Sequence, residues 1–310
     1  MNSQHLILGD WGTSSLTLML YGTENGQYMH LQSRKGLGAK FCQDFEEYFH
    51  QLADEWYAEY GNIPAILSGM VGAAIGWYDT GYLACPLSLA DLAAQPTKFI
   101  SRGRSITLMG GAKCCNRLGN SDVMRGEEMQ IFGWLAGQPD QDKHHLLCLP
   151  GTHTKWALTS KKNIQEFLTI PSGELHNIIS QHSIFVDTDD DVASVIDATF
   201  FKETIERIRQ APEMNFLNMV FSTRSKRALG HITNAQAHTY LSALLIGFDV
   251  RTAISLYGDH LTPQTIIPII GAKLNAELYA AALTCFGLKS DIIRNDDVTS
   301  IALLKAFRPK

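Results

Sequence analysis

Two short turns in this sequence combine glycine with hydroxyl side chains, a pattern that suits the binding of phosphate groups. The first, G-T-S-S at residues 12–15, follows the apolar run I-L-G-D-W. The second, G-T-H-T-K at residues 151–155, follows L-C-L-P about one domain length further along the chain. Glycine lets the backbone turn tightly, hydroxyls donate hydrogen bonds, and lysine adds a point charge. Two such turns facing each other across a cleft predict an ATP-using phosphotransferase.

Asp10 lies near the end of the first apolar run, two residues before Gly12 opens the first turn. A carboxylate at this place can hold Mg²⁺, usually through water, while the metal bridges phosphate oxygens. It can equally cap its own turn. Because a second phosphate-type turn occurs in the chain, we favour the metal role.

The segment Gly126-Glu127-Glu128 supplies the best candidate for a general base. Phosphoryl transfer to an alcohol needs a carboxylate that accepts the hydroxyl proton. Two glutamates at a predicted helix start can place one carboxylate in the cleft, although the helix dipole alone also favours acids there. Arg125 beside them can bind a substrate carboxylate or pair with a glutamate.

Other nucleotide-binding and metal-binding patterns do not occur in the chain. It contains neither G-x-x-x-x-G-K-[ST] nor G-x-G-x-x-G, and no H-E-x-x-H zinc motif. Ile270-Gly271-Ala272 ends a predicted strand and opens a predicted helix, so a planar ligand can approach the backbone there. An ordinary strand-to-helix turn has the same appearance.

Strand and helix patterns alternate around these motifs. Strands are predicted over 5–9, 15–21, 63–67, 104–109, 146–149, 164–167 and 266–270. Helices are predicted over 43–60, 128–137, 173–182, 194–209, 213–221, 234–257, 273–286 and 296–308. Residues 110–121 are predicted to form a polar, glycine-rich connection. Two similar halves of mixed strands and helices indicate an α/β fold with domains 1–138 and 144–310 around a cleft, and the last helix is free to pack back on the first domain.

Composition excludes several classes of protein. The 310 residues are 45% hydrophobic with a formal net charge of −5, so the chain can bury sizeable cores and has no basic excess for nucleic acid or a membrane surface. We find no secretory leader and no apolar run long enough to span a bilayer, and we expect a cytoplasmic protein. The sequence is compatible with either a monomer or a homodimer. The six cysteines form no C-x-x-C pair and are expected to be reduced, with a redox role for Cys114-Cys115 as the alternative.

Several longer motifs lie in order along the chain. They are D-W-G-T-S-S-L, S-G-M-V-G-x-x-x-G-W, Y-L-x-x-P, V-M-R-G-E-E-x-Q-I-x-G, L-P-G-T-H-T-K-W, S-G-E-L-H, H-S-I, R-x-L-G, Y-L-S-x-L-L-I-G and I-G-A-K-L. With them the chain resembles the sugar-kinase, actin and heat-shock-chaperone ATPase superfamily, and within it the 2-dehydro-3-deoxygalactonokinase (2-keto-3-deoxygalactonate kinase) family. V-M-R-G-E-E and P-G-T-H-T-K-W are specific to this kinase family rather than shared by the superfamily.

The resemblance implies a two-domain, actin-like (ribonuclease H-like) fold with an interdomain cleft. It also implies Mg-ATP-dependent phosphorylation of the 6-hydroxyl of 2-keto-3-deoxygalactonate, in galactonate breakdown. Asp10 then matches the first phosphate motif, and Glu127 corresponds to the catalytic acid in the G-D-Q loop of related kinases. We expect ATP to be bound by Gly12, Thr13, Ser14, Gly151, Thr152, His153, Thr154, Lys155, Gly271 and Ala272. We expect the sugar acid to be bound by Ser15, Gly69, Met70, Trp77, Arg125 and Glu128.

The chain departs from the family pattern at three places. Thr17 stands where the family often has arginine, residues 73–75 carry no polar group, and Thr80-Gly81 replaces Ala-Pro. These positions are near the expected substrate side, so they concern which sugar acid is used. A kinase for another keto-deoxy acid or a hexose is one alternative. A non-catalytic, actin-like ATP switch is the other, but a switch has no need of a base such as Glu127.

Overall fold

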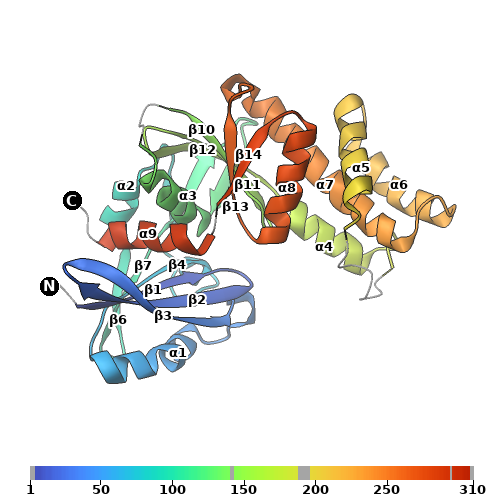
Figure 1. The fold of residues 1–310 in the computed structure, drawn as a ribbon. Helices are drawn as coiled ribbons and strands as arrows, with labels where there is room; N and C mark the ends of the chain where they lie inside the picture. Colours follow the sequence, from blue (N-terminus) through green and yellow to red (C-terminus); the bar gives the residue numbers. More distant parts are fainter. Residues whose placement is uncertain (1–3, 140–142, 188–195, 294, 308–310) are drawn as a thin grey trace. The chain divides into compact units, whose positions relative to one another are not determined.

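The computed structural model describes residues 4–139, 143–187, 196–293 and 295–307. The chain divides into two compact units, each built on a β-sheet with helices against it (Figure 1). The first comprises Met1–Lys143, Thr159–Phe167 and Asn295–Lys310, and the second comprises His144–Leu158 and Leu168–Arg294. The predicted helix positions 194, 195 and 308 lie outside the described residues.

The first unit contains a six-stranded sheet in the order β3-β2-β1-β4-β7-β6. Its strands are β1 (His5–Trp11), β2 (Ser15–Glu24), β3 (Gln27–Leu37), β4 (Ala65–Gly69), β6 (Thr97–Ser101) and β7 (Arg104–Leu108). β1 is antiparallel to β2 and parallel to β4, which is parallel to β7. The carboxyl ends of β1, β4 and β7 therefore lie at one edge of the sheet, the usual place for ligands in such sheets.

Helices α1 (Phe45–Tyr60) and α9 (Asn295–Phe307) lie on opposite faces of this sheet (Figure 1). Asp44 caps α1 by accepting a hydrogen bond from the N–H of Glu47 (2.9 Å), a typical N-cap. The helix buries an apolar face in the same core as the strands. α9 packs closely on α3 (Glu127–Ala136). The backbone of Val298 in α9 approaches Gly133 of α3 so closely that no Cβ would fit at residue 133.

A small three-stranded sheet and a short helix, α2 (Leu89–Ala94), complete the first unit. The sheet has the order β5-β8-β9, with β5 (Tyr82–Ala84), β8 (Gly111–Cys115) and β9 (Ser121–Met124). The prediction of a connection over residues 110–121 is therefore wrong, since this stretch forms a hairpin. The Asn116 side chain stabilises its turn by accepting the N–H groups of Leu118 and Asn120 (3.0 and 3.1 Å).

The second unit is built on a five-stranded sheet in the order β12-β11-β10-β13-β14, of which residues 159–167, at the end of β11 and in most of β12, are grouped with the first unit. Its strands are β10 (His145–Leu149), β11 (Thr154–Ser160), β12 (Asn163–Ile170), β13 (Ile266–Ile270) and β14 (Lys289–Ile293). β13 is parallel to both β10 and β14. In chain order these five strands occupy the same positions as β1, β2, β3, β4 and β7 of the first unit, so the two sheets repeat one arrangement.

Among its described residues, the second unit has five α-helices (Figure 1): α4 (Ser172–His182), α5 (Ala198–Gln210), α6 (Phe216–Ala228), α7 (Asn234–Tyr257) and α8 (Lys273–Cys285). α5, α7 and α8 bury apolar side chains in one core with the strands. By length and composition, residues 234–260 form one helix able to cross a membrane, contrary to the sequence prediction. The most apolar window of this helix is 67% buried inside the protein, which is typical of a core helix.

Candidate active site

The first glycine–threonine turn connects β1 to β2. The N–H of Gly12 donates to the backbone oxygen of Ser15 (2.9 Å), and backbone oxygens of the turn accept the N–H groups of Ala39 and Lys40 (both 3.0 Å). The side chains of residues 13–15 are exposed. Hydrogen bonds thus fix the backbone of the turn from both sides, while its three hydroxyls stay at the surface.

Asp10 is half-buried at the carboxyl end of β1, where the adjacent residue in β4 is Ser68. Thr299 of α9 donates a hydrogen bond to its Oδ2 atom (3.5 Å). Among the described residues, no cluster of three or more His, Cys, Asp or Glu side chains forms a metal cage. A single carboxylate is compatible with Mg²⁺, which commonly keeps several waters and takes its other ligands from phosphates.

The two glutamates at the start of α3 lie in different environments. The N–H of Gly126, at φ 105°, donates to both carboxylate oxygens of Glu128 (2.9 and 2.8 Å), and the N–H of Arg125 donates to Glu127 Oε2 (3.1 Å). Glu128 has no exposed surface, whereas Glu127 is half-buried. Burial, and then the charge of Glu127, raise the pKa of Glu128 to about 8. Only Glu127 therefore has surface that a substrate can reach in this conformation.

Arg125 lies folded against residues 79–82. Its guanidinium donates to Thr80 Oγ1 (2.5 Å) and to the backbone oxygen of Gly81 (2.9 Å), and it lies 4.3 Å from the ring centroid of Tyr82. Its ion pair is with Asp79 (3.9 Å). The buried Nε atom has no hydrogen-bond partner within the described residues. Arg125 thus connects the start of α3 to one of the loops expected to face the sugar acid.

The S-G-M-V-G segment passes close to both of these features. Gly69 has φ 91°, and a Cβ there would lie 3.0 Å or less from backbone atoms of Trp11. A Cβ on Gly126 would in turn lie 3.4 Å from the Cα of Gly69. Met70 begins a 3₁₀ turn, Met70–Gly72. Trp77, by contrast, packs against the ring of Phe49 at the edge of the core (5.6 Å between centroids).

The second glycine–threonine turn is connected to the start of α4. The N–H of Glu174 donates to the backbone oxygen of Thr152 (2.9 Å), and its carboxylate lies 2.8 Å from Nε2 of His153. Gly173 approaches the backbone oxygen of Gly151 so closely that no Cβ would fit. These contacts hold the N-terminal end of α4 against the turn, so that Gly151, Thr152 and Gly173 line one cavity.

Thr154 and Lys155 belong to β11 rather than to the exposed part of the turn. Both are buried, at 1% and 4% exposure. The Thr154 hydroxyl bonds to the Tyr279 hydroxyl (2.8 Å), and the Lys155 ammonium donates to the backbone oxygen of His153 (3.3 Å). Of the five residues predicted to contact phosphate here, the structure places only residues 151–153 at the surface.

A cavity of about 410 Å³ opens in the second unit between this turn and helices α4, α7 and α8. Residues 150–152 and the start of α4 line one part, and Leu245, Ile246 and Leu278 add an apolar wall. Gly271 directly follows β13 and lies beside the second glycine–threonine turn. A Cβ on Gly271 would lie 2.9 Å from the backbone oxygen of Pro150. The volume is in the range of small-ligand sites.

A buried polar network behind this cavity was missed in the sequence analysis. Asp249 of α7 accepts hydrogen bonds from Trp156 Nε1 (2.6 Å), Ser172 Oγ (2.5 Å) and the Tyr279 hydroxyl (2.6 Å). Burial raises the pKa of Asp249 to about 6, and these hydrogen bonds oppose the increase. The network joins β11, α4, α7 and α8, and Ser172 and Tyr279 also line the cavity. A lone aspartate within the apolar pattern of α7 was the available signal.

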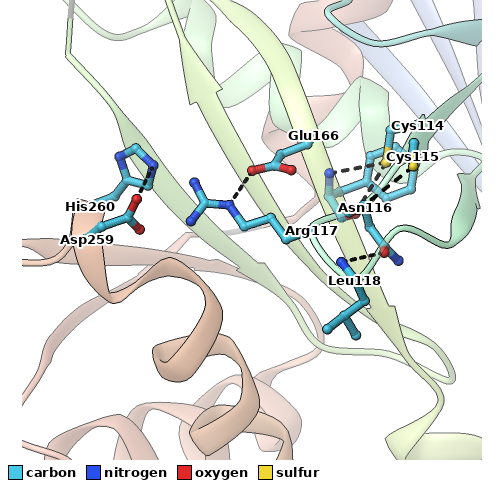
Figure 2. Close-up of polar contacts among 9 residues, drawn as sticks. Cys114, Cys115, Asn116, Arg117, Leu118, Glu166, Asp259 and His260 are labelled. Atoms are coloured by element: carbon cyan, nitrogen blue, oxygen red, sulfur yellow. Dashed lines mark hydrogen bonds and ion pairs between the residues drawn. The ribbon is translucent and has the colours of Figure 1, made fainter.

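The adjacent cysteines of β8 have different surroundings, as Figure 2 shows. The Cys114 thiol donates to the backbone oxygen of Phe167 (3.3 Å), and burial raises its pKa to about 11. Cys115 is exposed, and both are free thiols. Next to them Arg117 and Glu166 form an ion pair (2.6 Å). A half-buried, hydrogen-bonded thiol with a raised pKa favours the structural role for Cys114.

Comparison with known proteins shows to which family this chain is similar. Residues 10–306 match the model of the 2-keto-3-deoxy-galactonokinase family. The chain is 30% identical to a probable 2-dehydro-3-deoxygalactonokinase of Rhizobium meliloti (strain 1021), over 96% of this chain and 95% of the relative. It is 29% identical to the 2-dehydro-3-deoxygalactonokinase of Escherichia coli (strain K12), over 96% and 93%. The crystal structure of a Sinorhizobium meliloti protein assigned to the same activity has a TM-score of 0.84 at 29% identity, covering 98% of this chain and all of that one. This likeness and the repeated sheet confirm the predicted two-domain, actin-like ATPase fold.

Proposed function

The chain belongs to the 2-keto-3-deoxy-galactonokinase family, and we propose that it transfers a phosphoryl group from ATP to the 6-hydroxyl of 2-dehydro-3-deoxy-D-galactonate. The observation that carries this proposal is the family match over residues 10–306, which contains both glycine–threonine turns and the glutamate pair. The product would be the 6-phosphate, formed in galactonate breakdown.

We assign the cavity of the second unit to ATP. Leu245, Ile246 and Leu278 supply apolar surface for a base, while Gly151 and Thr152 supply backbone groups and a hydroxyl for phosphate. The N-terminal end of α4 lies beside the same turn, and its dipole favours negative charge. This assignment places the phosphates near Gly151 and the nucleoside further along α4.

We assign Asp10 to Mg²⁺. Its half-buried carboxylate stands at the ligand-binding edge of the first sheet, beside the exposed hydroxyls of residues 13–15. When bound, the metal would neutralise negative charge on the phosphate oxygens, which is its general role in phosphoryl transfer. Asp10 would supply a charge that an amide cannot replace.

Glu127 is the general base in this proposal. Its Oε2 accepts the N–H of Arg125, and its side chain keeps exposed surface for a substrate hydroxyl. The proton of the 6-hydroxyl passes to the Glu127 carboxylate as the new O–P bond forms and the terminal O–P bond of ATP breaks, which releases ADP.

Glu128 acts as a positioning residue, in place of the sugar contact expected from the sequence. Its fully buried carboxyl group holds the N–H of Gly126 at the point where the chain turns into α3. This hydrogen bond fixes the direction in which the neighbouring Glu127 leaves the backbone. Arg125 supports the adjacent loop of residues 79–82, and its positive charge favours an acidic substrate nearby.

An ADP-release assay over a panel of acceptors tests the function. Purified protein with Mg-ATP is expected to release ADP with 2-dehydro-3-deoxygalactonate and only weakly with hexoses or with an analogue whose carboxylate is reduced. Glu127→Gln is the inactive control. Equal turnover of the acid and its reduced analogue would indicate a general sugar kinase. ADP release that no acceptor stimulates would instead support an ATP switch.

A further inference from the structure

His176 and Ser242 form a polar pair in the wall of the second-unit cavity, away from the phosphate turn. His176 follows Ser172 and Gly173 on α4 by about one helical turn, which advances the chain by roughly 5 Å. Ser242 faces it from α7. Neither residue has a part in the reaction described above, so their presence in this wall needs a separate explanation.

Hydrogen bonds determine which ring nitrogen of His176 carries the proton. Ser242 Oγ donates to the backbone oxygen of His238 (3.0 Å) and lies 2.9 Å from Nε2 of His176. A hydroxyl has one proton, and a carbonyl oxygen can only accept, so Nε2 of His176 must be the donor in the second bond. This assignment follows from the network and leaves Nδ1 of a neutral ring as an acceptor.

The surroundings keep that acceptor in place. Burial, and then the nearby His238, lower the pKa of His176, which favours the neutral ring at neutral pH. Within the described residues, Nδ1 of His176 has no hydrogen-bond partner. Nδ1 is not among the buried polar atoms that lack a partner, so it keeps contact with solvent, and a donor on a bound ligand can take the place of water there.

We infer that His176 is a specificity-determining residue for the nucleotide, and that its Nδ1 atom accepts a hydrogen bond from the nucleoside of ATP. The donors of that nucleoside are the 6-amino group of adenine and the ribose hydroxyls. The inference rests on the proposed function, because it takes this cavity to be the site of ATP.

Two isosteric variants separate this role from a purely structural one. In His176→Gln the amide nitrogen replaces Nε2, so the bond to Ser242 is kept and the acceptor is lost. In His176→Asn the amide oxygen replaces Nδ1, so the acceptor is kept and the bond to Ser242 is lost. We expect His176→Gln to bind ADP about threefold to tenfold more weakly than wild type, and His176→Asn to stay within about twofold, from the usual worth of one neutral hydrogen bond.

Isothermal titration calorimetry with ADP measures these constants without turnover, and thermal unfolding of each variant shows that it folds. The KM for ATP should follow the same order, with a smaller change in kcat at saturating ATP. Weakened binding in His176→Asn together with wild-type binding in His176→Gln would overturn the inference and leave only the structural bond to Ser242.

Nucleotide analogues identify the donor. Purine riboside diphosphate lacks the 6-amino group, and 2′-deoxy-ADP and 3′-deoxy-ADP each lack one ribose hydroxyl. We expect one of them to bind wild type about threefold to tenfold more weakly than ADP, and to bind His176→Gln no worse than ADP. Equal losses in both proteins would refute the inference alone. No binding of ADP to wild type would refute the proposed function as well.

Discussion

Glu128 is expected to make the protein less stable as the pH rises through the neutral range. Burial raises its pKa from 4.5 to about 8, so the folded protein holds this proton more tightly than the unfolded chain does. The stability that the folded protein gains by holding this proton is fully present below about pH 4.5 and is lost as the pH rises through about 8. Linkage gives a slope of about 1.4 kcal/mol per pH unit, and on the order of 4 to 5 kcal/mol across the whole window.

The variant Glu128→Gln cannot ionise and should lose this slope, while its amide oxygen can still accept the N–H of Gly126. Glu127→Gln is the matched control, because it keeps Glu128. The charge of Glu127 is the second cause of the raised pKa of Glu128. Its removal should therefore lower that pKa, so that the loss of stability ends at a lower pH than in wild type, while the slope below that pH is unchanged. Asp249, with a pKa of about 6, adds the same contribution to all three proteins and cancels in the differences.

Equilibrium urea unfolding from pH 5 to 8, followed by tryptophan fluorescence, measures the free energy of unfolding of the three proteins. The difference between wild type and Glu128→Gln should fall by about 1.4 kcal/mol per pH unit. A difference independent of pH would show that the buried carboxyl group does not titrate in this window, and the reasoning from burial would be wrong.

The same two variants test the assignment of the base. Glu127→Gln should lose on the order of 10²–10⁴-fold in kcat, the usual contribution of general base catalysis. Glu128→Gln should retain more activity, because Glu128 only positions its neighbour. The reverse order in an ADP-release assay would make Glu128 the base.

Three further changes test other parts of the site. Asp10→Asn should reduce ADP release by more than about tenfold with an unchanged circular dichroism spectrum, and a smaller loss would remove Asp10 from the metal role. Gly173→Ala should cost about 1 to 3 kcal/mol in urea unfolding and raise the KM for ATP, because no Cβ fits beside the backbone of Gly151; Gly151→Ala, with open space around it, is the control for folding. Trp156→Phe should cost about 1.5 to 3 kcal/mol by removing a hydrogen bond to the Asp249 carboxylate, and wild-type stability would show that water replaces the indole donor.

Local sequence patterns predicted the inner strands of the two larger sheets other than β11, and the long helices. The strands predicted over 5–9, 15–21 and 266–270 are confirmed as β1, β2 and β13, and the helix over 43–60 as α1. Their apolar residues repeat at the spacing of one buried face, which is visible in any short window. The two turns and the glutamate pair could be located in the same way, because glycine and acidic residues mark turns and helix starts.

Edge strands other than β12 were not predicted, and β3 and β14 show the physical reason. β3 and β14 lie at the edges of their sheets and are largely exposed, so their residues show no strong alternation. Their strand conformation depends on pairing with β2 and β13. Such pairing depends on partners that no short window of sequence contains.

The chemistry of the site divides in the same way. The sequence alone determined which residues carry charge and hydroxyl groups near the turns. Only the tertiary structure decided that Glu128 is buried while Glu127 is not, that Thr154 and Lys155 belong to an inner strand, and that Asp249 joins four elements behind the cavity. Burial is set by what the rest of the chain packs around a side chain, so a pKa raised by burial and a shared hydrogen-bond network arise only when distant segments meet.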